Sequence, residues 1–138
     1  MGFGKSISSC FGKFAVFNGR ASRSEYWFFM LFVSILSFLS SFLGSIISLL
    51  IGLILFLPGL SVYVRRLHDT DRSGWYYFIP LTIVGFGFIV VNFSDTGFAI
   101  FVLFASVSVA VILSLWWTIQ RGSFDTNRYG PNPIEVTP

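Results

Sequence analysis

A chain of 138 residues has room for one domain. Its residues are 54% hydrophobic and 11% charged, with a mean hydropathy of +0.79. Soluble globular domains carry roughly 25% charged residues, so this composition excludes them and predicts an integral membrane protein. The net charge of +3 does not indicate nucleic-acid binding, because the Lys and Arg residues flank apolar segments. Anionic lipid head groups are the expected counter-charge.

Residues 1–20 are predicted to form an interfacial helix, and they lack the continuous apolar run of a signal peptide. Within 3–17, one helical face is apolar and the opposite face is polar. The apolar face carries Phe3, Ile7, Cys10, Phe11, Phe14 and Phe17, and the polar face carries Lys5, Ser6, Ser8, Ser9 and Lys13. This pattern is typical of an amphipathic helix in the head-group region. The alternative is a frayed terminus, because three glycines weaken the helix.

Two membrane-spanning helices are predicted in the uncharged run from Tyr26 to Val64. As one helix, this run would be about 58 Å long at ~1.5 Å per residue, nearly twice the ~30 Å hydrocarbon core. A break near Gly44 divides it into spans at about 24–43 and 46–65.

Short local signals mark the ends and bends of these helices. Ser22 and Glu25 have the spacing of a capping box at the start of the first span. Pro58 removes a backbone hydrogen bond within the second span and predicts a kink there. The third span begins after Asp71 or Ser73, because either side chain can cap a helix.

The charged stretch 65–75 is expected to be a loop at the membrane surface, followed by two further spans. They cover about 74–93 and 98–120, with a polar turn between them. Residues 121–138 are expected to form an irregular, solvated cytoplasmic tail rich in turn-forming residues. The predicted fold class is therefore all-α: four transmembrane helices preceded by an amphipathic interfacial helix.

Small residues recur at helical spacing, and in lipid such seams let helices pack closely. They comprise Ser34, Ser37, Ser41 and Ser45 along the first span, Ser48 and Gly52 on the second, and Ser106, Ala110 and Ser114 on the fourth. Helix packing is their expected role. A polar ligand or water path along the serines is the alternative.

The positive charges predict the orientation in the membrane. Every Lys and Arg lies before the first span, between the second and third, or after the fourth, and paired spans bring these regions to one side. The positive-inside rule assigns this side, with both termini, to the cytoplasm. All Trp and Tyr residues fall at or beyond the same ends of the spans, as an interfacial belt requires.

Three charged motifs follow one another on this predicted cytoplasmic side. They are Phe17-Asn18-Gly19-Arg20-Ala21-Ser22-Arg23-Ser24-Glu25-Tyr26-Trp27, then Arg65-Arg66-Leu67-His68-Asp69 with Ser73-Gly74-Trp75, then Asn127-Arg128-Tyr129-Gly130-Pro131-Asn132-Pro133. In these motifs the chain resembles the domain of unknown function 805 family, small bacterial inner-membrane proteins, over nearly its whole length. Asn132 departs from the Asp that the family often has there. The resemblance implies a multi-pass protein of the bacterial inner membrane and brings no catalytic residue with it.

The predicted hairpins bring a cluster of charged side chains to the cytoplasmic face, which is the candidate site. It comprises Arg20, Arg23, Glu25, Arg65, Arg66, His68, Asp69, Arg72, Trp75 and Arg128, and Asp71, Arg121 and Asp125 lie on the same face. Pairs of Arg23 or Arg66 with Glu25, Asp69 or Asp71 are expected to hold the helices in register. The excess of arginine predicts binding of anionic lipid head groups, of a membrane-protein partner or of a second copy. No cofactor, metal or nucleic-acid partner is expected.

Two other functions stay open as alternatives. A small transporter or pore component is one, although ion coupling is disfavoured because the predicted spans contain no Asp, Glu or His beyond Glu25 in the first turn of the first span. The other is a membrane enzyme acting on a phosphate-bearing substrate, with His68 as the base and Asp69 as its orienter. Adjacent residues on a helix project about 100° apart, so the side chains of His68 and Asp69 could meet only if the backbone there were non-helical. A non-enzymatic role in scaffolding or binding is therefore the main prediction.

Overall fold

The structure is a computed structural model that describes residues 1–93 and 95–133. These residues form helices and no strands. In chain order they are α1 (Phe3–Gly12), α2 (Arg23–Ser41), α3 (Ser45–Asp69), the 3₁₀ helix η1 (Gly74–Tyr77), α4 (Phe78–Val91) and α5 (Thr96–Ile119). Four segments are long and apolar enough to cross a membrane: α2, α3, η1 with α4, and α5. The prediction of an all-helical chain with four candidate spans is confirmed.

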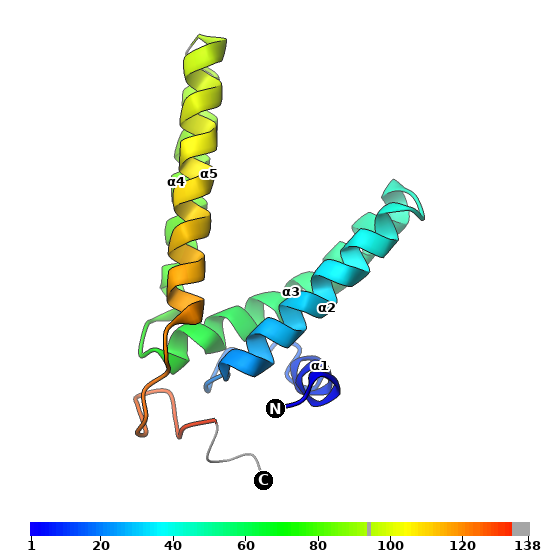
Figure 1. Ribbon diagram of the computed structural model, residues 1–138, viewed down its shortest axis with the longest axis vertical. Coiled ribbons are helices and arrows are strands. Elements are labelled where there is room, and N and C mark those ends of the chain that lie inside the picture. The colour runs from blue at the N-terminus through cyan, green and yellow to red at the C-terminus, as the bar shows by residue number, and fades with distance from the viewer. Residues whose placement is uncertain (94, 134–138) are drawn as a thin grey trace.

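The four spans form two hairpins that diverge like the arms of a V (Figure 1). In one arm α2 packs against α3, and in the other α4 packs against α5. The arms meet at one end, here called the base, where α2 and η1 begin and α3 and α5 end. The short helix α1 lies at the base against α2 and α3. All three charged motifs are consequently gathered at the base.

The helix α3 continues through the first part of the stretch 65–75 that was expected to be a loop. It ends at Asp69, four residues beyond the predicted span 46–65, and its last five residues include Arg65, Arg66 and Asp69. These charges stay helical because each is buried against an oppositely charged side chain and does not need water. Pro58 lies inside this helix, which changes direction along its length in Figure 1, as the predicted kink requires.

The other span boundaries differ from the predicted ones by at most two residues, whereas α1 ends at Gly12, eight residues before the end of the predicted interfacial segment 1–20. The spans predicted at 24–43 and 98–120 are Arg23–Ser41 and Thr96–Ile119. The span predicted at 74–93 begins with the 3₁₀ helix η1 and becomes α-helical from Phe78 to Val91. Pro80 explains this start, because it has no N–H to donate to the carbonyl of Tyr76 four residues earlier.

Two side chains cap helices where the sequence predicts it, but the capping box is only half formed. Ser22 accepts a hydrogen bond from the backbone N–H of Glu25 at 3.2 Å, and Ser73 accepts one from Trp75 at 3.4 Å. In a capping box the Glu25 carboxylate would turn back toward Ser22. Instead it accepts a hydrogen bond from Arg65, because an ion pair in a buried site is stronger than a neutral cap.

The predicted small residues contact a neighbouring helix on α5 and, at Ser48, on α3, but not on α2. On α5, Ser106 and Ala110 are buried, and Ser106 lies against Gly87 of α4 so closely that a Cβ on Gly87 would overlap it. On α2, the predicted face of Ser34, Ser37 and Ser41 is exposed, and Ser40 is buried instead. The Ser40 carbonyl accepts a hydrogen bond from Ser48 of α3, 2.8 Å away.

The helix α1 places a different face against the protein from the one its apolar pattern suggests. Ser6 and Cys10 are its buried residues, although Ser6 was expected on the polar face. Small side chains there let α1 approach α2 closely, and the Ser6 hydroxyl donates to the carbonyl of Gly2 at 3.0 Å. The larger Phe3 and Phe11 stand at the edge, where each makes an edge-to-face contact with a phenylalanine of α2 while staying partly exposed.

Candidate functional site

Asp69, the last residue of α3, is the centre of a buried ion-pair network at the base. One carboxylate oxygen accepts from Arg20, with Nε at 2.9 Å and Nη2 at 2.8 Å, and the other pairs with Arg66. Asp69 is 4% exposed, Arg20 6% and Arg66 0%. Two guanidinium groups therefore share one carboxylate out of water, and this group carries a net positive charge.

Arg20 and Arg66 use their remaining donors to hold the chain after α5 against the base. Arg20 donates to the carbonyls of Asp125 at 2.8 Å and Ser123 at 2.6 Å. Arg66 donates to the carbonyl of Thr118 at 3.0 Å and to that of Gln120. These carbonyls belong to the C-terminal end of α5 and the segment after it, where helices leave acceptors unused. The arginines satisfy them and so join three distant parts of the sequence.

The segment after α5 is irregular and has no buried residue within 121–133, as predicted, but it is also anchored to the base. Gly122 lies directly beside Asp69, and a side-chain Cβ at this position would overlap the carboxylate. The Ser123 N–H donates to the Asp69 carbonyl at 2.9 Å, and the Asn127 side chain donates to the carbonyl of His68 at 2.9 Å. Residues 134–138 of the predicted tail lie outside the described part of the chain.

A second buried ion pair joins α2 to α3. Arg65 Nη1 lies 2.8 Å from Glu25 Oε1, and Ser9 of α1 donates to the same oxygen at 3.0 Å. The remaining Arg65 donors, Nε and Nη2, have no partner among the described residues although they are buried. The thiol of Cys10 also approaches Glu25, and burial, reinforced by this carboxylate, raises the pKa of Cys10 to about 12. The thiol is therefore protonated at neutral pH and unreactive.

His68 and Asp69 do not form the catalytic pair that the enzyme alternative requires. The backbone is helical at both residues, so the two side chains point in different directions. His68 Nδ1 lies 3.2 Å from the carbonyl oxygen of Gly19, and its ring stacks on Tyr129 with centroids 3.7 Å apart. Both Asp69 oxygens are taken by arginines. His68 thus holds the N-terminal loop and the C-terminal turn together.

The other predicted site residues lie at the rim of the network. Arg128 pairs with Asp71 at 3.1 Å, and both side chains are exposed. Arg23 forms no ion pair within residues 1–93 and 95–133, and it donates to the carbonyl of Ile119 at 3.3 Å. Trp75 is 76% exposed and lines an apolar groove between α3, η1 and α4. The expected pairing of Arg66 with Asp69 is present, whereas Arg23 does not pair with a carboxylate.

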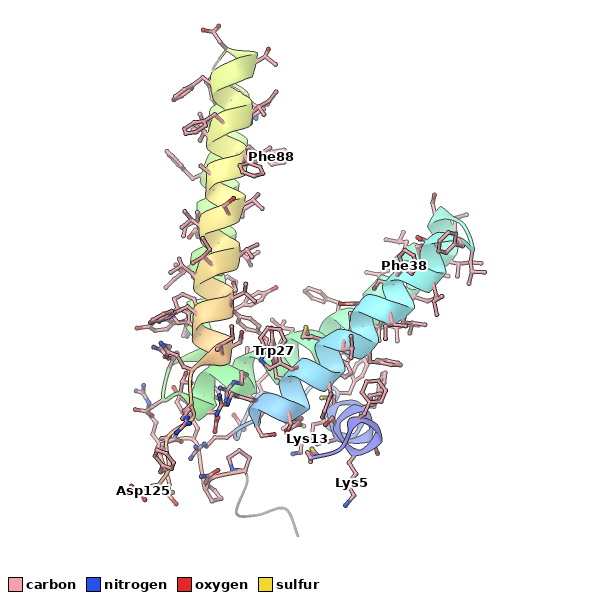
Figure 2. All side chains as sticks on the ribbon, viewed as in Figure 1. Lys5, Lys13, Trp27, Phe38, Phe88 and Asp125 are labelled. Atoms are coloured by element: carbon pink, nitrogen blue, oxygen red, sulfur yellow. The ribbon has the colours of Figure 1, made fainter. Side chains whose placement is uncertain are left out.

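The base carries more positive charge than its carboxylates neutralise. Of the nine Lys and Arg residues, all within the described ranges, four form ion pairs. The five without a carboxylate partner there are Lys5, Lys13, Arg23, Arg72 and Arg121. Figure 2 shows that Lys5 points away from the body of the protein. This surplus is available to anions outside the chain.

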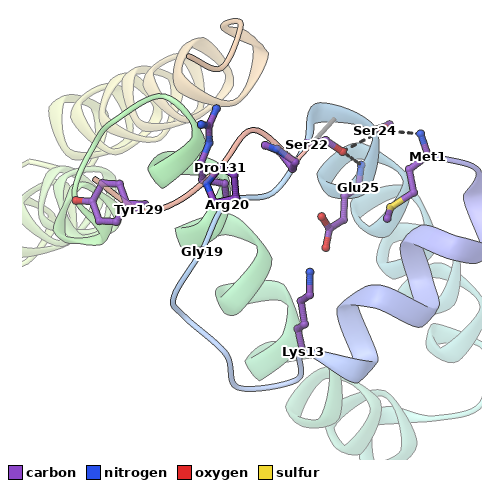
Figure 3. A pocket seen from close by; sticks show the side chains of 10 residues that line it. Met1, Lys13, Gly19, Arg20, Ser22, Ser24, Glu25, Tyr129 and Pro131 are labelled. Carbon is purple, nitrogen blue, oxygen red and sulfur yellow. Dashed lines mark hydrogen bonds between the residues drawn. The ribbon is translucent and has the colours of Figure 1, made fainter. Parts of the chain in front are cut away.

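Two cavities whose lining includes charged and hydroxyl side chains open at the base. The first, of about 270 Å³, lies between α1, the loop before α2 and the C-terminal turn, and Lys13 and Glu25 point toward each other across it (Figure 3). The second, of about 390 Å³, lies between the start of α2 and the segment after α5. No group of three or more His, Cys, Asp or Glu side chains in the described sequence is placed to hold a metal ion.

Sequence reasoning placed the charged residues on one face but missed several members of the network. The missed members are Ser9, the backbone carbonyls after Leu115, and the close approach of Gly122 to Asp69. Gly122 and Ser123, shortly after the last span, could have indicated this close approach, because small residues allow a chain to turn against a helix end. Carbonyl acceptors carry no such signal, since every residue has one.

Comparison with known proteins supports the three-motif resemblance. A family model described as "Protein of unknown function (DUF805)" matches residues 14–131. The chain belongs to this family. It is 34% identical over 128 residues to inner membrane protein YhaH of Escherichia coli (strain K12), covering 85% of this chain and 86% of that protein. It is 38% identical over 89 residues to inner membrane protein YhaI of the same strain, covering 59% of this chain and 75% of that protein. No solved structure matches the chain.

The DUF805 membership agrees with the four candidate spans: the chain is an inner-membrane protein with apolar helices long enough to cross the bilayer. The matched region begins after α1 and ends at the C-terminal turn, so it includes both residues of each of the four ion pairs but not Ser9.

Proposed function

We propose that this DUF805 protein is a non-enzymatic membrane protein whose base binds anionic phospholipid head groups. The observation that carries the proposal is the surplus of five cations without a carboxylate partner at the base, in the described residues. Each Lys or Arg near an anionic membrane surface contributes about 1 kcal/mol of attraction. The buried ion pairs serve a different purpose in this proposal, because they fix the helix ends that present the free cations.

The orientation belongs to the same proposal: the base faces the cytoplasm, with both termini on that side. All nine Lys and Arg residues lie at the base, and the turns at the far ends of the two arms have none. The inner leaflet also carries the negative surface potential that these cations would meet.

The position of α1 is also part of this proposal. Its exposed phenylalanines, Phe3 and Phe11, and its exposed Lys5 suit a helix that lies in the head-group region beside the spans. In this position α1 covers the buried Glu25 from one side while its lysine remains in contact with head groups.

Native mass spectrometry of the full chain from nanodiscs tests the binding proposal. In discs of mixed phosphatidylcholine and phosphatidylglycerol, we expect the wild type to retain phosphatidylglycerol. Neutralising Lys5, Lys13 and Arg72 together with glutamine should weaken this retention, by about fivefold for each charge removed. Arg128→Gln is the control, because Arg128 already forms an ion pair with Asp71 and does not belong to the surplus of cations. Equal retention of both lipids by the wild type refutes the proposal, and a retained protein chain would point to a partner instead.

A further inference from the structure

We propose that the 390 Å³ cavity between α2 and the segment after α5 is a binding site for a phosphate group, held by Arg23 and Arg121. The inference rests on the proposed binding of anionic head groups and names a position and a chemistry for it. The cavity is also lined by the hydroxyl residues Ser22, Ser24 and Ser123, and by Asp69.

The charges around this cavity favour an anion. Arg23 and Arg121 have no carboxylate partner within residues 1–93 and 95–133. The carboxylate in the wall, Asp69, is already paired with both Arg20 and Arg66. Arg23 also lies close enough to Arg66 to repel its positive charge. A group of four arginines and one carboxylate is thus left with a net positive charge that the described chain does not balance.

The backbone at the start of α2 adds to this preference. Arg23 and Ser24 are the first two residues of a helix of 19 residues, so their N–H groups have no acceptor within the helix. The N-terminal end of the helix dipole favours a negative charge at the same place. The Arg23 guanidinium reaches across to the carbonyl of Ile119, which places it at the end of α5 beside Arg121.

A phosphate matches this site better than a carboxylate does. Arginine binds phosphate oxygens through two parallel N–H groups, and two arginines from different elements supply more donors than one carboxylate can accept. Along the chain, Trp27 follows Arg23 by four residues on α2, and Trp116 precedes Arg121 by five residues in the last turn of α5. Interfacial tryptophans lie at the depth of lipid head groups. The phosphate belongs either to a lipid head group at this depth or to free phosphate from the cytoplasmic side.

Charge-conserving substitutions separate this site from general attraction to the basic face. We expect Arg121→Lys, and Arg23→Lys with Arg121→Lys, to weaken phosphate binding about tenfold or more, because lysine lacks the two-pronged geometry. Arg72→Lys is the matched control: Arg72 is another unpaired arginine, and it does not line the cavity. Arg121 makes no side-chain hydrogen bond in the described structure, so Arg121→Lys tests binding without disturbing the fold.

Two probes distinguish the sources of the phosphate. The first is retention of phosphatidylglycerol in mixed nanodiscs by native mass spectrometry. The second is the rise in melting temperature of the chain in phosphatidylcholine nanodiscs on adding inorganic phosphate, against chloride at equal ionic strength. Loss of either response in the lysine variants, with Arg72→Lys unchanged, supports the site. Loss of phosphatidylglycerol retention identifies the phosphate as that of a lipid head group, and loss of the melting-temperature rise identifies it as free phosphate. If the wild type and the lysine variants retain phosphatidylglycerol equally and neither responds to phosphate, the site is refuted while the proposed function stands. If the wild type shows neither response, both fail.

Discussion

Arg65 and Arg66 are neighbours in the sequence but hold different parts of the protein. Adjacent residues on a helix project about 100° apart, so the two guanidiniums leave α3 in different directions. Arg65 meets Glu25 of α2, and Arg66 meets Asp69 and the end of α5. Both side chains are almost fully buried. Removing either one leaves a buried carboxylate with one partner fewer in a medium that solvates charge poorly.

We therefore expect Arg65→Gln to lower the free energy of unfolding by about 3–5 kcal/mol, because Glu25 would keep its charge without an ion-pair partner. The matched control is Arg128→Gln, whose ion pair with Asp71 is exposed and should be worth no more than about 1 kcal/mol. Thermal unfolding of both variants in the same detergent measures the difference. Equal melting temperatures would contradict the buried pair.

The arm formed by α4 and α5 owes its close packing to a glycine rather than to polar contacts. Gly87 lies against Ser106 and the backbone of Leu103. Lipid is as apolar as the helix surfaces, so association depends on such close approach of backbones. Gly85 precedes Gly87 by two residues on the same helix, and a Cβ at Gly85 would contact no other atom.

Gly87→Ala should accordingly destabilise this arm by about 1–3 kcal/mol, since the added methyl group overlaps Ser106. Gly85→Ala should be neutral or slightly stabilising, because alanine favours the helix by up to ~1 kcal/mol and meets nothing. Comparing the two variants in detergent unfolding removes the effect of helix propensity. The packing account fails if Gly87→Ala is as stable as Gly85→Ala.

In the whole molecule, the two arms are joined at the base and not along their lengths. Figure 1 shows them diverging away from the base, where α3 contacts both η1 and α5. The ion pairs and the carbonyl acceptors of Arg20 and Arg66 lie at this junction. The network therefore lies where the two arms meet, and the unpaired Arg23 and Arg121 lie beside it.

Reporter fusions test the orientation that the proposed function requires. We expect a reporter that is active only in the cytoplasm to work when fused at Thr70 and to fail when fused after Gly44 or Asp95, because the positively charged base is retained inside. A periplasm-specific reporter at the same positions should give the opposite pattern. Cytoplasmic activity at Gly44 or Asp95 would reverse the orientation and separate the base from the anionic inner leaflet.

The sequence by itself determined the membrane class, the number of spans, the helix cap at Ser22 and the DUF805 family, because these depend on hydropathy, length and short motifs. It left Asp71 and Ser73 as alternative caps for the third span, and the structure decided for Ser73. The sequence also placed the charged residues on one face. Tertiary structure decided which charges pair. Arg20 pairs with Asp69, 49 residues away in the sequence, and Arg65 pairs with Glu25, 40 residues away. Tertiary structure also decided that α3 continues to Asp69 and that the segment after α5 folds back. The sequence could not decide between a helix and a loop for these charged residues, because a charge is stabilised either by a buried partner of opposite sign or by water. Only the tertiary structure shows which of the two surrounds it.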